Sequence, residues 1–322
     1  MMRIAFLGSD AIALPLLDWL GGGGGPGEVA AVFTQPDRPA GRGQKIAPNA
    51  VKAWALDRGV PVFQPERLGE AEQRQLAGLG ADLSLVLAYG HILREDFIAT
   101  PRLGTLNLHA SLLPQYRGAS PIQAAIASGE PWTGVTLMRI VRRLDAGPLG
   151  GSETVPIAPL DTAREIEGRL AAACVPLLAR TLPLLGRGAL AFVDQDEARA
   201  TYCRKLDKAD GALDFAAPAA ALAARINGLF PWPGCVIELD GQPIRLGLAD
   251  VAAEVSSAAP GLVLGADALG LLVASGEGTL RLRRLQRPGG RLLEAGEFLR
   301  GRPIPAGTRL PSQPMPPLVE KR

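Results

Sequence analysis

Short runs of aliphatic and β-branched residues alternate with longer amphipathic stretches over the first two hundred residues. The short runs predict strands at 3–7, 29–34, 83–87, 105–108 and 135–138. The stretches between them repeat apolar residues every three to four positions and predict helices at 12–20, 49–57, 71–79 and 121–128. Strands that alternate with helices are typical of a mainly parallel sheet covered on both faces. The pattern therefore predicts a Rossmann-like, doubly wound α/β domain.

The pattern changes after residue 200. A helix predicted at 218–228 is followed by five short, glycine-bounded strands at 235–239, 244–248, 261–264, 270–274 and 279–285, which predict a small antiparallel barrel. A capping box of Thr162 and Glu165 begins the helix that closes the first domain. We expect an α/β domain at 1–189, a linker at 190–203, a barrel domain at 204–302 and a loose Pro-rich tail at 303–322.

Composition places the chain among ordinary globular proteins, with 47% hydrophobic and 20% charged residues. The apolar run at the start is too short for a signal peptide, and no uninterrupted apolar stretch reaches membrane-spanning length. The three cysteines lie far apart and match no metal-ligand spacing, so they are interpreted as reduced thiols. We expect a cytoplasmic protein with no bound metal and no membrane contact.

Positive charge is concentrated in two places although the net charge is only +2. Residues 281–302 hold seven arginines against two glutamates, and residues 102–143 hold five arginines against one glutamate. Such clusters are often solvated faces. Beside a cleft, they would instead suit a polyanionic partner such as RNA.

Asn107 and His109 are the first candidates for chemistry, and His109 is one of only two histidines in the chain. They lie two residues apart at the end of a predicted strand, so their side chains share one face. A loop rich in Pro and Gly follows, which places the pair at the carboxyl edge of the sheet where ligands bind. An amide and an imidazole there are suited to holding and protonating a carbonyl oxygen. Asp145 lies where a later predicted strand ends and a Gly-Pro turn begins. Considered alone, Asp145 would be interpreted as a turn residue and His109 as a structural histidine.

Two other motifs are weaker. The five glycines at 21–25 follow a predicted helix and precede no Gly-Lys-Ser/Thr, so they predict a flexible connection instead of a phosphate-binding loop. Ser111 follows His109 by two residues, but this spacing along one strand does not make a nucleophile–base pair, which disfavours a hydrolase triad.

The chain resembles the 10-formyltetrahydrofolate-dependent formyltransferases in three sequence motifs. These are N-x-H-x-S-L-L-P at 107–114, R-G-x-x-P-I at 117–122 and L-D-x-G at 144–147. The resemblance covers nearly the whole chain, and it implies that the C-terminal domain is an OB-like β-barrel. It also implies that Asn107 donates to the oxyanion, that His109 stabilises it or moves a proton, and that Asp145 orients His109. The residues that it implies for 10-formyltetrahydrofolate binding are Tyr89, Gly90, Ile92, Ser111, Leu112, Leu113, Pro114 and Asp145.

Residues 33–43 indicate the acceptor. Composition alone would make this segment an exposed Pro/Gly turn. Its sequence is similar to that of a loop in the members of this family that act on methionyl-tRNA. In those enzymes the loop enters the acceptor end of initiator tRNA. The resemblance therefore implies formyl transfer to the amino group of methionine on initiator methionyl-tRNA, for translation initiation, by an enzyme that we expect to be a monomer. The residues expected to contact tRNA are Arg38, Arg42, Lys45, Arg283 and Arg287.

Two alternatives stay open at this point. An amino-sugar formyltransferase would use the same chemistry, but would leave the 33–43 loop and the basic barrel without a role. A catalytically inactive folate- or RNA-binding relative is disfavoured by the intact Asn107, His109 and Asp145. The chain also departs from the family at Val141 and Arg143, where Asp and Gly are common, so the loop before Asp145 is expected to differ in shape.

Overall fold

The computed structural model describes residues 1–40, 45–254 and 256–321. Its contacts divide the chain into two compact units, neither of which is continuous in sequence. The first consists of Met1–Arg117, Gly134–Val155 and Glu167–Ala200. The second consists of Gly118–Thr133, Pro156–Ile166 and Thr201–Arg322.

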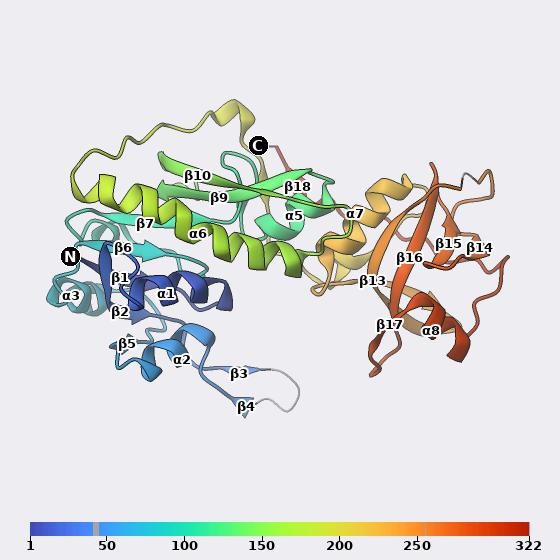
Figure 1. The fold of residues 1–322 in the computed structure, drawn as a ribbon, viewed down its shortest axis with the longest axis horizontal. Helices are drawn as coiled ribbons and strands as arrows, with labels where there is room; N and C mark the ends of the chain where they lie inside the picture. Colours follow the sequence, from blue (N-terminus) through green and yellow to red (C-terminus); the bar gives the residue numbers. More distant parts are fainter. Residues whose placement is uncertain (41–44, 255, 322) are drawn as a thin grey trace. The chain divides into compact units, whose positions relative to one another are not determined.

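A seven-stranded sheet forms the centre of the first unit (Figure 1). Its order is β10-β9-β7-β6-β1-β2-β5, and neighbours from β7 to β5 pair in parallel, whereas β9 runs antiparallel to β7. This confirms the predicted mainly parallel α/β fold. The strands are β1 (Met2–Leu7), β2 (Gly27–Phe33), β5 (Val62–Phe63), β6 (Leu83–Val86), β7 (Thr105–His109), β9 (Trp132–Arg139) and β10 (Leu149–Pro156).

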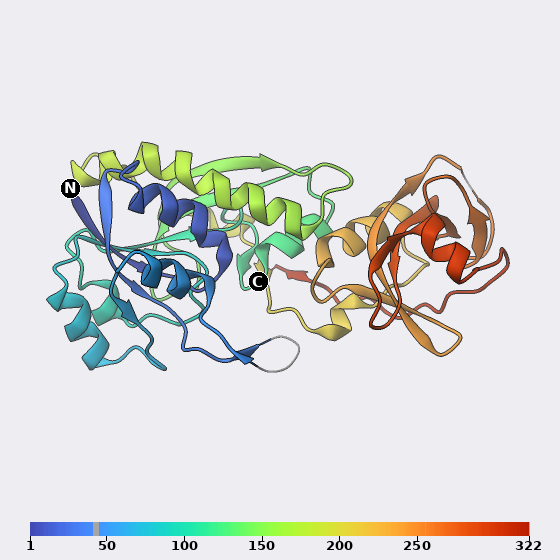
Figure 2. The same ribbon diagram turned by 60° about the horizontal axis from the view of Figure 1, so that its bottom comes forward.

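Helices cover this sheet, and α1 and α6 run along the same face of it (Figures 1 and 2). The central strands are consequently buried on both sides; β6, for example, is buried throughout. Asn49 begins α2 by accepting a hydrogen bond from the Lys52 N–H at 3.0 Å. The helical segments are η1 (Ala11–Ala13), α1 (Leu14–Gly21), α2 (Ala50–Asp57), α3 (Glu70–Gly78), α4 (Glu95–Ile98) and α6 (Ala163–Gly186).

Helix α6 begins at the predicted capping box, where the Thr162 N–H donates to the Glu165 carboxylate at 2.9 Å. Ile166, Leu170 and Cys174 are fully buried along one side of it, as their four-residue spacing predicts. Among the described residues, α6 alone is long and apolar enough to cross a membrane by length and composition. Half of its apolar window is buried within the protein, as in a core helix.

The second unit contains an antiparallel sheet in the order β12-β13-β16-β15-β14, with β17 beside β16. This confirms the predicted antiparallel C-terminal fold. The strands are β12 (Cys235–Leu239), β13 (Gln242–Ala252), β14 (Val263–Ala266), β15 (Leu271–Ala274), β16 (Thr279–Gln286) and β17 (Leu292–Glu294). Helix α7 (Ala219–Leu229) packs on β13 and against α5 (Pro121–Ala127), and α8 (Ala295–Gly301) packs on β16. The remaining short elements are β8 (Arg117–Gly118), η2 (Glu197–Arg199), β11 (Tyr202–Cys203), η3 (Lys208–Gly211) and β18 (Val319–Glu320).

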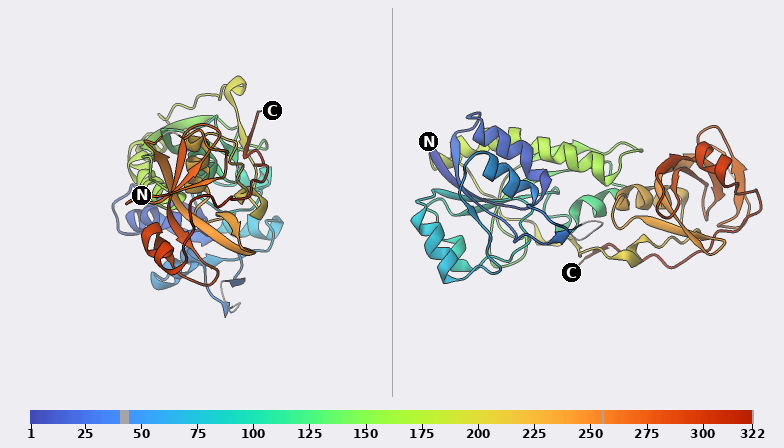
Figure 3. Two further views of the ribbon diagram at one scale, coloured as in Figure 1. Left: turned by 90° about the vertical axis from the view of Figure 1, so that its right-hand side faces the viewer. Right: turned by 90° about the horizontal axis from the view of Figure 1, so that it is seen from below.

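The Pro-rich tail is packed, which contradicts the expectation of a loose end. Ile304, Leu310 and Leu318 are buried in the core of the second unit. The Leu310 N–H donates to the Gly261 carbonyl at 2.8 Å, and β18 pairs with β11. In Figure 3 the segment, drawn in red, runs back along this unit after α8. The prolines suggested an irregular segment, but the sparse apolar residues between them supply enough burial to hold it.

The sequence also missed some strands. Strand β10 carries Gly150, Gly151 and Ser152, so it has no apolar alternation to reveal it. Strand β5 has only two residues, and the same holds for the hairpin strands β3 (Pro39–Ala40) and β4 (Lys45–Ile46). Val193 was expected to lie in a linker, but it is paired with the first unit. Leu149 and Val193 exchange two backbone hydrogen bonds of 2.8 and 3.0 Å.

Candidate active site

His109 is the last residue of β7 and is almost completely buried. Its Nε2 lies 2.8 Å from the Tyr116 carbonyl oxygen. A carbonyl only accepts, so this contact assigns the ring proton to Nε2. The other ring nitrogen, Nδ1, faces Asp145 Oδ2 at 3.8 Å. The two residues that the sequence singled out separately are therefore neighbours in the structure.

Asp145 projects from the turn between β9 and β10, and its side chain is only 12% exposed. Its backbone has a φ of +48°, in the left-handed region that is uncommon for residues other than glycine. Gly147 lies two residues on, where the backbone passes so close to β9 that a Cβ would be 1.8 Å from the Arg139 carbonyl oxygen. The turn is therefore pressed against the sheet, and only glycine fits at that approach.

Asn107 is half-buried in β7, two residues before His109 and on the same face of the strand. Within the described part of the chain, its side-chain amide forms no hydrogen bond. The amide is therefore available to a substrate oxygen. Asn107, His109 and Asp145 supply a hydrogen-bond donor, an imidazole and a carboxylate at one edge of the sheet.

Three loops meet at the carboxyl end of β1, whose neighbours β2 and β6 lie on opposite sides of it. The Gly8 N–H donates to the Phe33 carbonyl at 3.1 Å, and the Ser9 N–H donates to the Ala88 carbonyl at 3.2 Å. The Gln35 side chain donates to the Tyr89 carbonyl at 3.0 Å. This is the position in the sheet where the strand order reverses, and ligands of open α/β sheets bind at such positions.

The segment predicted to hold folate combines buried and exposed residues. Tyr89 is buried, which raises the pKa of its phenol far above the ordinary value. Its hydroxyl and the Nε2 of His91 are buried polar atoms without a hydrogen-bond partner among the described residues, and the two rings are in contact with centroids 5.1 Å apart. Gly90 has a φ of +81°, and Ile92 is 93% exposed.

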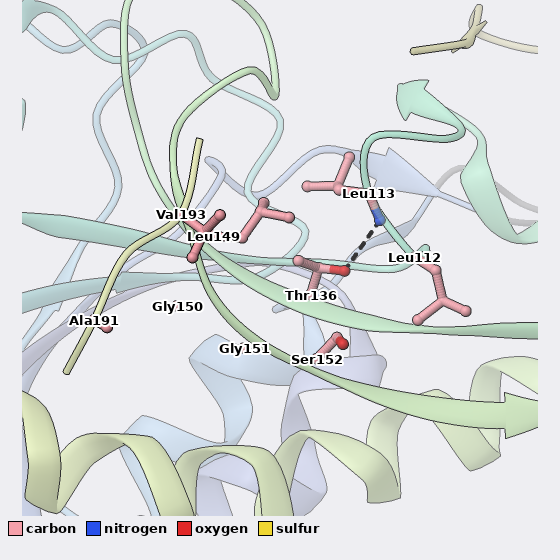
Figure 4. Close-up of a pocket in the computed structure, with 9 residues that line it drawn as sticks. All are labelled: Leu112, Leu113, Thr136, Leu149, Gly150, Gly151, Ser152, Ala191 and Val193. Atoms are coloured by element: carbon pink, nitrogen blue, oxygen red, sulfur yellow. Dashed lines mark hydrogen bonds between the residues drawn. The ribbon is translucent and has the colours of Figure 1, made fainter. Parts of the chain in front are cut away.

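The signature loop after His109 is held by its own hydrogen bonds. Ser111 is fully buried, and its hydroxyl donates to the Gln115 carbonyl at 2.7 Å. Thr136 in β9 donates to the Ser111 carbonyl at 2.6 Å. It accepts from the Leu113 N–H at 3.1 Å (Figure 4). Ser111 therefore shapes the loop, which continues through a cis bond into Pro114.

A pocket of about 290 Å³ lies beside this loop. Leu112, Leu113 and Thr136 form one part of its lining, and residues of β10 and of the segment after α6 form the remainder (Figure 4). Its lining is largely apolar, and none of the three catalytic candidates contributes to it. In the described ranges, no group of three or more His, Cys, Asp or Glu side chains is arranged to hold a metal ion.

The residues predicted to contact tRNA lie in different settings. Arg38 is 67% exposed and 3.1 Å from Glu66. Arg42 falls outside the described residues, and Lys45 begins β4. In the second unit Arg283 donates to Asp250 at 3.0 Å, and the guanidinium of Arg287 lies 5.3 Å from the centroid of the Phe298 ring. The side chains of Arg38, Arg283 and Arg287 are thus partly occupied by contacts within the protein.

Sequence reasoning missed three residues beside the site. Gln195 donates to the carbonyl oxygens of Asp145 and Gly147, at 2.8 Å each. Arg117, fully buried, binds Gln195 and Glu197. Arg117 stood within the recognised motif and could have been noticed there. Gln195 and Glu197 lay in a polar stretch without a motif, so no signal marked them.

Comparison with known proteins identifies the family. A family model described as formyl transferase matches residues 2–182, and one described as formyl transferase, C-terminal domain matches residues 205–303. The chain is 44% identical over 310 residues to methionyl-tRNA formyltransferase of Methylococcus capsulatus, covering 96% of this chain and 99% of that protein. The chain belongs to the methionyl-tRNA formyltransferase family. A second member of this family, from Aromatoleum aromaticum, is 42% identical over 309 residues and covers 96% of both chains.

Solved structures share the fold at low sequence identity. An N-formyltransferase from Helicobacter canadensis, solved with folinic acid and dTDP-3-aminofucose, has a TM-score of 0.66 at 16% identity, covering 88% of this chain and 99% of that one. HypX from Aquifex aeolicus has a TM-score of 0.60 at 17% identity and covers 93% of this chain and 48% of that one. At these identities the likeness to both structures bears on the fold alone.

Proposed function

We propose that this chain transfers the formyl group of 10-formyltetrahydrofolate to the amino group of methionine on initiator methionyl-tRNA, for translation initiation. The observation that carries the proposal is the near-complete match, at 44% identity, to a methionyl-tRNA formyltransferase. The proximity of His109 to Asp145, together with the half-buried Asn107 on the same strand as His109, supports the same chemistry.

Asn107 acts on the formyl oxygen. When the amine attacks the formyl carbon, this oxygen gains negative charge, and an N–H donor that is already in place stabilises it. A single donor of this kind contributes about a hundred- to a thousandfold in rate. The Asn107 amide suits this role because no other described group competes for it.

His109 and Asp145 handle the proton. The Tyr116 carbonyl fixes the Nε2–H of His109, and the Asp145 carboxylate faces Nδ1. The methionine nitrogen loses one proton before it attacks and a second one afterwards. The His109–Asp145 pair passes one of these protons to the nitrogen of tetrahydrofolate when its bond to the formyl carbon breaks, and the other proton goes to solvent. The Asp145 carboxylate stabilises the imidazolium form of His109 during this transfer. General acid–base catalysis contributes roughly a hundred- to ten-thousandfold.

The residues at 89–92 fit the formyl donor. The orphaned hydroxyl of Tyr89 and Nε2 of His91 offer polar contacts, and the exposed Ile92 offers an apolar surface for a flat heterocycle. When bound, 10-formyltetrahydrofolate supplies the formyl carbon. Gly90 and the loop carrying Leu112, Leu113 and Pro114 complete the proposed donor site, with Ser111 supporting that loop from within.

Arg38, Arg42, Lys45, Arg283 and Arg287 are the proposed contacts to tRNA. Guanidinium and ammonium groups bind phosphates, and guanidinium also stacks on bases. We place the enzyme in the cytoplasm, since its three cysteines are unpaired and buried and its substrates are those of translation. The monomeric state stays an expectation.

A formylation assay tests the function. The purified chain is given 10-formyltetrahydrofolate with charged initiator tRNA, and separately with a nucleotide-linked amino sugar. We expect formylation of the tRNA alone, and we expect His109→Ala to lose at least about a hundredfold in kcat while retaining the fold. Formylation of the sugar and not of the tRNA would overturn the proposal.

A further inference from the structure

The segment that follows α6 runs alongside the loop that carries Asp145. Val193 exchanges two backbone hydrogen bonds with Leu149, and Gln195 lies two residues further on. Glu197 then forms an ion pair with Arg143 at 2.5 Å. Residues 193–197 therefore contact the segment 143–149 at three successive positions.

Gln195 uses all of its hydrogen-bonding capacity in this contact. Its amide nitrogen donates to the carbonyl oxygens of Asp145 and Gly147 at 2.8 Å each. Its amide oxygen accepts from Arg117 Nε at 3.0 Å and Arg117 Nη2 at 2.7 Å. Only this orientation of the amide matches two acceptors on one side and two donors on the other.

Arg117, which binds Gln195, is itself bound by Glu197. Its guanidinium is fully buried and forms two hydrogen bonds with Glu197, of 3.1 and 2.9 Å. These hydrogen bonds lower the pKa of Glu197 below its usual value. A buried guanidinium that lost these acceptors would be costly, so the pair is expected to stay formed. The residue before Arg117 is Tyr116, whose carbonyl accepts the hydrogen bond from His109.

Asp145 has a left-handed backbone, which Asp tolerates better than most residues other than glycine but does not prefer. A left-handed backbone at a residue other than glycine costs on the order of 1 kcal/mol and persists only where neighbouring contacts impose it. The two hydrogen bonds from Gln195 fix the peptide groups after Asp145 and after Gly147.

We propose that Gln195, anchored by Arg117 and Glu197, is a positioning residue that holds Asp145 opposite His109. It touches no substrate and acts through Asp145. Its catalytic consequence rests on the proposed function above, whereas its effect on the His109–Asp145 pair does not. The contact from Tyr116 to His109 makes Arg117 a common support for both members of that pair.

The first test is a double-mutant cycle. Gln195→Met has a similar volume but neither donates to the loop nor accepts from Arg117, and it is expected to lower kcat about ten- to a hundredfold with little change in KM for tRNA. In an Asp145→Asn background the same change is expected to cost little more, because its effect passes through Asp145. Equal losses in both backgrounds would overturn the proposal. Gln75→Met, on the exposed side of α3, is the control.

The second test needs no activity, so it separates this proposal from the proposed function. A crystal structure of the variant gives the separation between His109 Nδ1 and Asp145 Oδ2, which is 3.8 Å in the intact chain. In Gln195→Met this separation is expected to lengthen, because the peptide groups after Asp145 and after Gly147 lose the two hydrogen bonds that fix them. An unchanged separation of His109 and Asp145 would refute the positioning role. Should Gln195→Met not fold, Gln195→Glu retains the acceptors for Arg117 but cannot donate to Asp145 and Gly147, and it must still reduce kcat.

Discussion

At the scale of single residues, Asn107 and His109 were found because they lie at the end of a predicted strand, and Asp145 because it precedes a Gly-Pro turn. Alternation places Asn107 and His109 on one face, and this needs only local geometry. That Asp145 lies opposite His109 followed only from the family resemblance, because 36 residues separate them in sequence. Gln195 escaped notice because its role depends on the backbone carbonyls of another loop, which the sequence of its own segment does not encode.

Gly147 gives a prediction at this scale. Gly147→Ala would place a Cβ 1.8 Å from the Arg139 carbonyl oxygen, so the turn carrying Asp145 has to move away from β9. We expect kcat to fall at least about tenfold, since small misplacements of catalytic groups are costly. The measurement is steady-state formylation beside a thermal melt.

Gly78→Ala is the matched control, because a Cβ on this helical glycine meets nothing within 4 Å. It should leave kcat unchanged and stabilise the fold by up to about 1 kcal/mol. Wild-type kcat in Gly147→Ala would mean that the turn tolerates displacement and that its fit against β9 does not matter for the reaction.

At the scale of elements, the strands that alternation or apolar runs identify were predicted within a few residues. Strand β12 lies at 235–239, as expected, while β13 extends to Gln242–Ala252 because its partner β16 continues to pair with it. Strand direction was less accessible. The antiparallel pairing of β7 with β9 depends on how the chain returns to the sheet, which residue patterns do not specify.

The loop after β2 supplies the prediction for this scale. The Gln35 side chain connects this loop to residues 89–92 of the proposed folate site, because it donates a hydrogen bond to the Tyr89 carbonyl. Gln64 in turn donates to the Gln35 carbonyl at 2.9 Å. Gln35→Leu removes the first hydrogen bond while leaving the backbone contact. We expect the KM for 10-formyltetrahydrofolate to rise about two- to tenfold, as for the loss of one hydrogen bond.

Gln73→Leu, a half-buried glutamine of α3, serves as the comparison for a change of the same size. Steady-state kinetics with the donor varied at saturating tRNA measures both variants. An unaltered KM in Gln35→Leu would show that the connection between the two loops has no bearing on the donor site.

At the scale of the whole molecule, the basic C-terminal segment proves to be two populations of arginines. Those on β16 are paired: Arg281 with Asp250 and Asp267, Arg283 with Asp250, and Arg284 with Glu294. Arg291 and Arg300 are exposed and have no carboxylate partner among the described residues. Charge counting along the sequence treated them alike, because it cannot register which arginines already have a counter-ion.

This division predicts how the salt dependence of tRNA affinity responds to substitution. Each phosphate contact releases bound counter-ions, so the logarithm of affinity falls linearly with the logarithm of salt concentration, by about 0.7 to 0.9 per contact. The double variant Arg291→Ala/Arg300→Ala should weaken binding at low salt and reduce this slope by about 1.4 to 1.8 if both contact phosphates. Arg283→Ala should reduce it less and lower the melting temperature as well, because it leaves Asp250 short of one partner. Filter binding at salt concentrations from roughly 50 to 200 mM resolves slopes of this size and measures the affinity of both variants. A larger change in slope for Arg283→Ala would contradict this division. It would mean that Arg283 leaves Asp250 to bind a tRNA phosphate, and that residues 281–302 bind tRNA through their paired arginines.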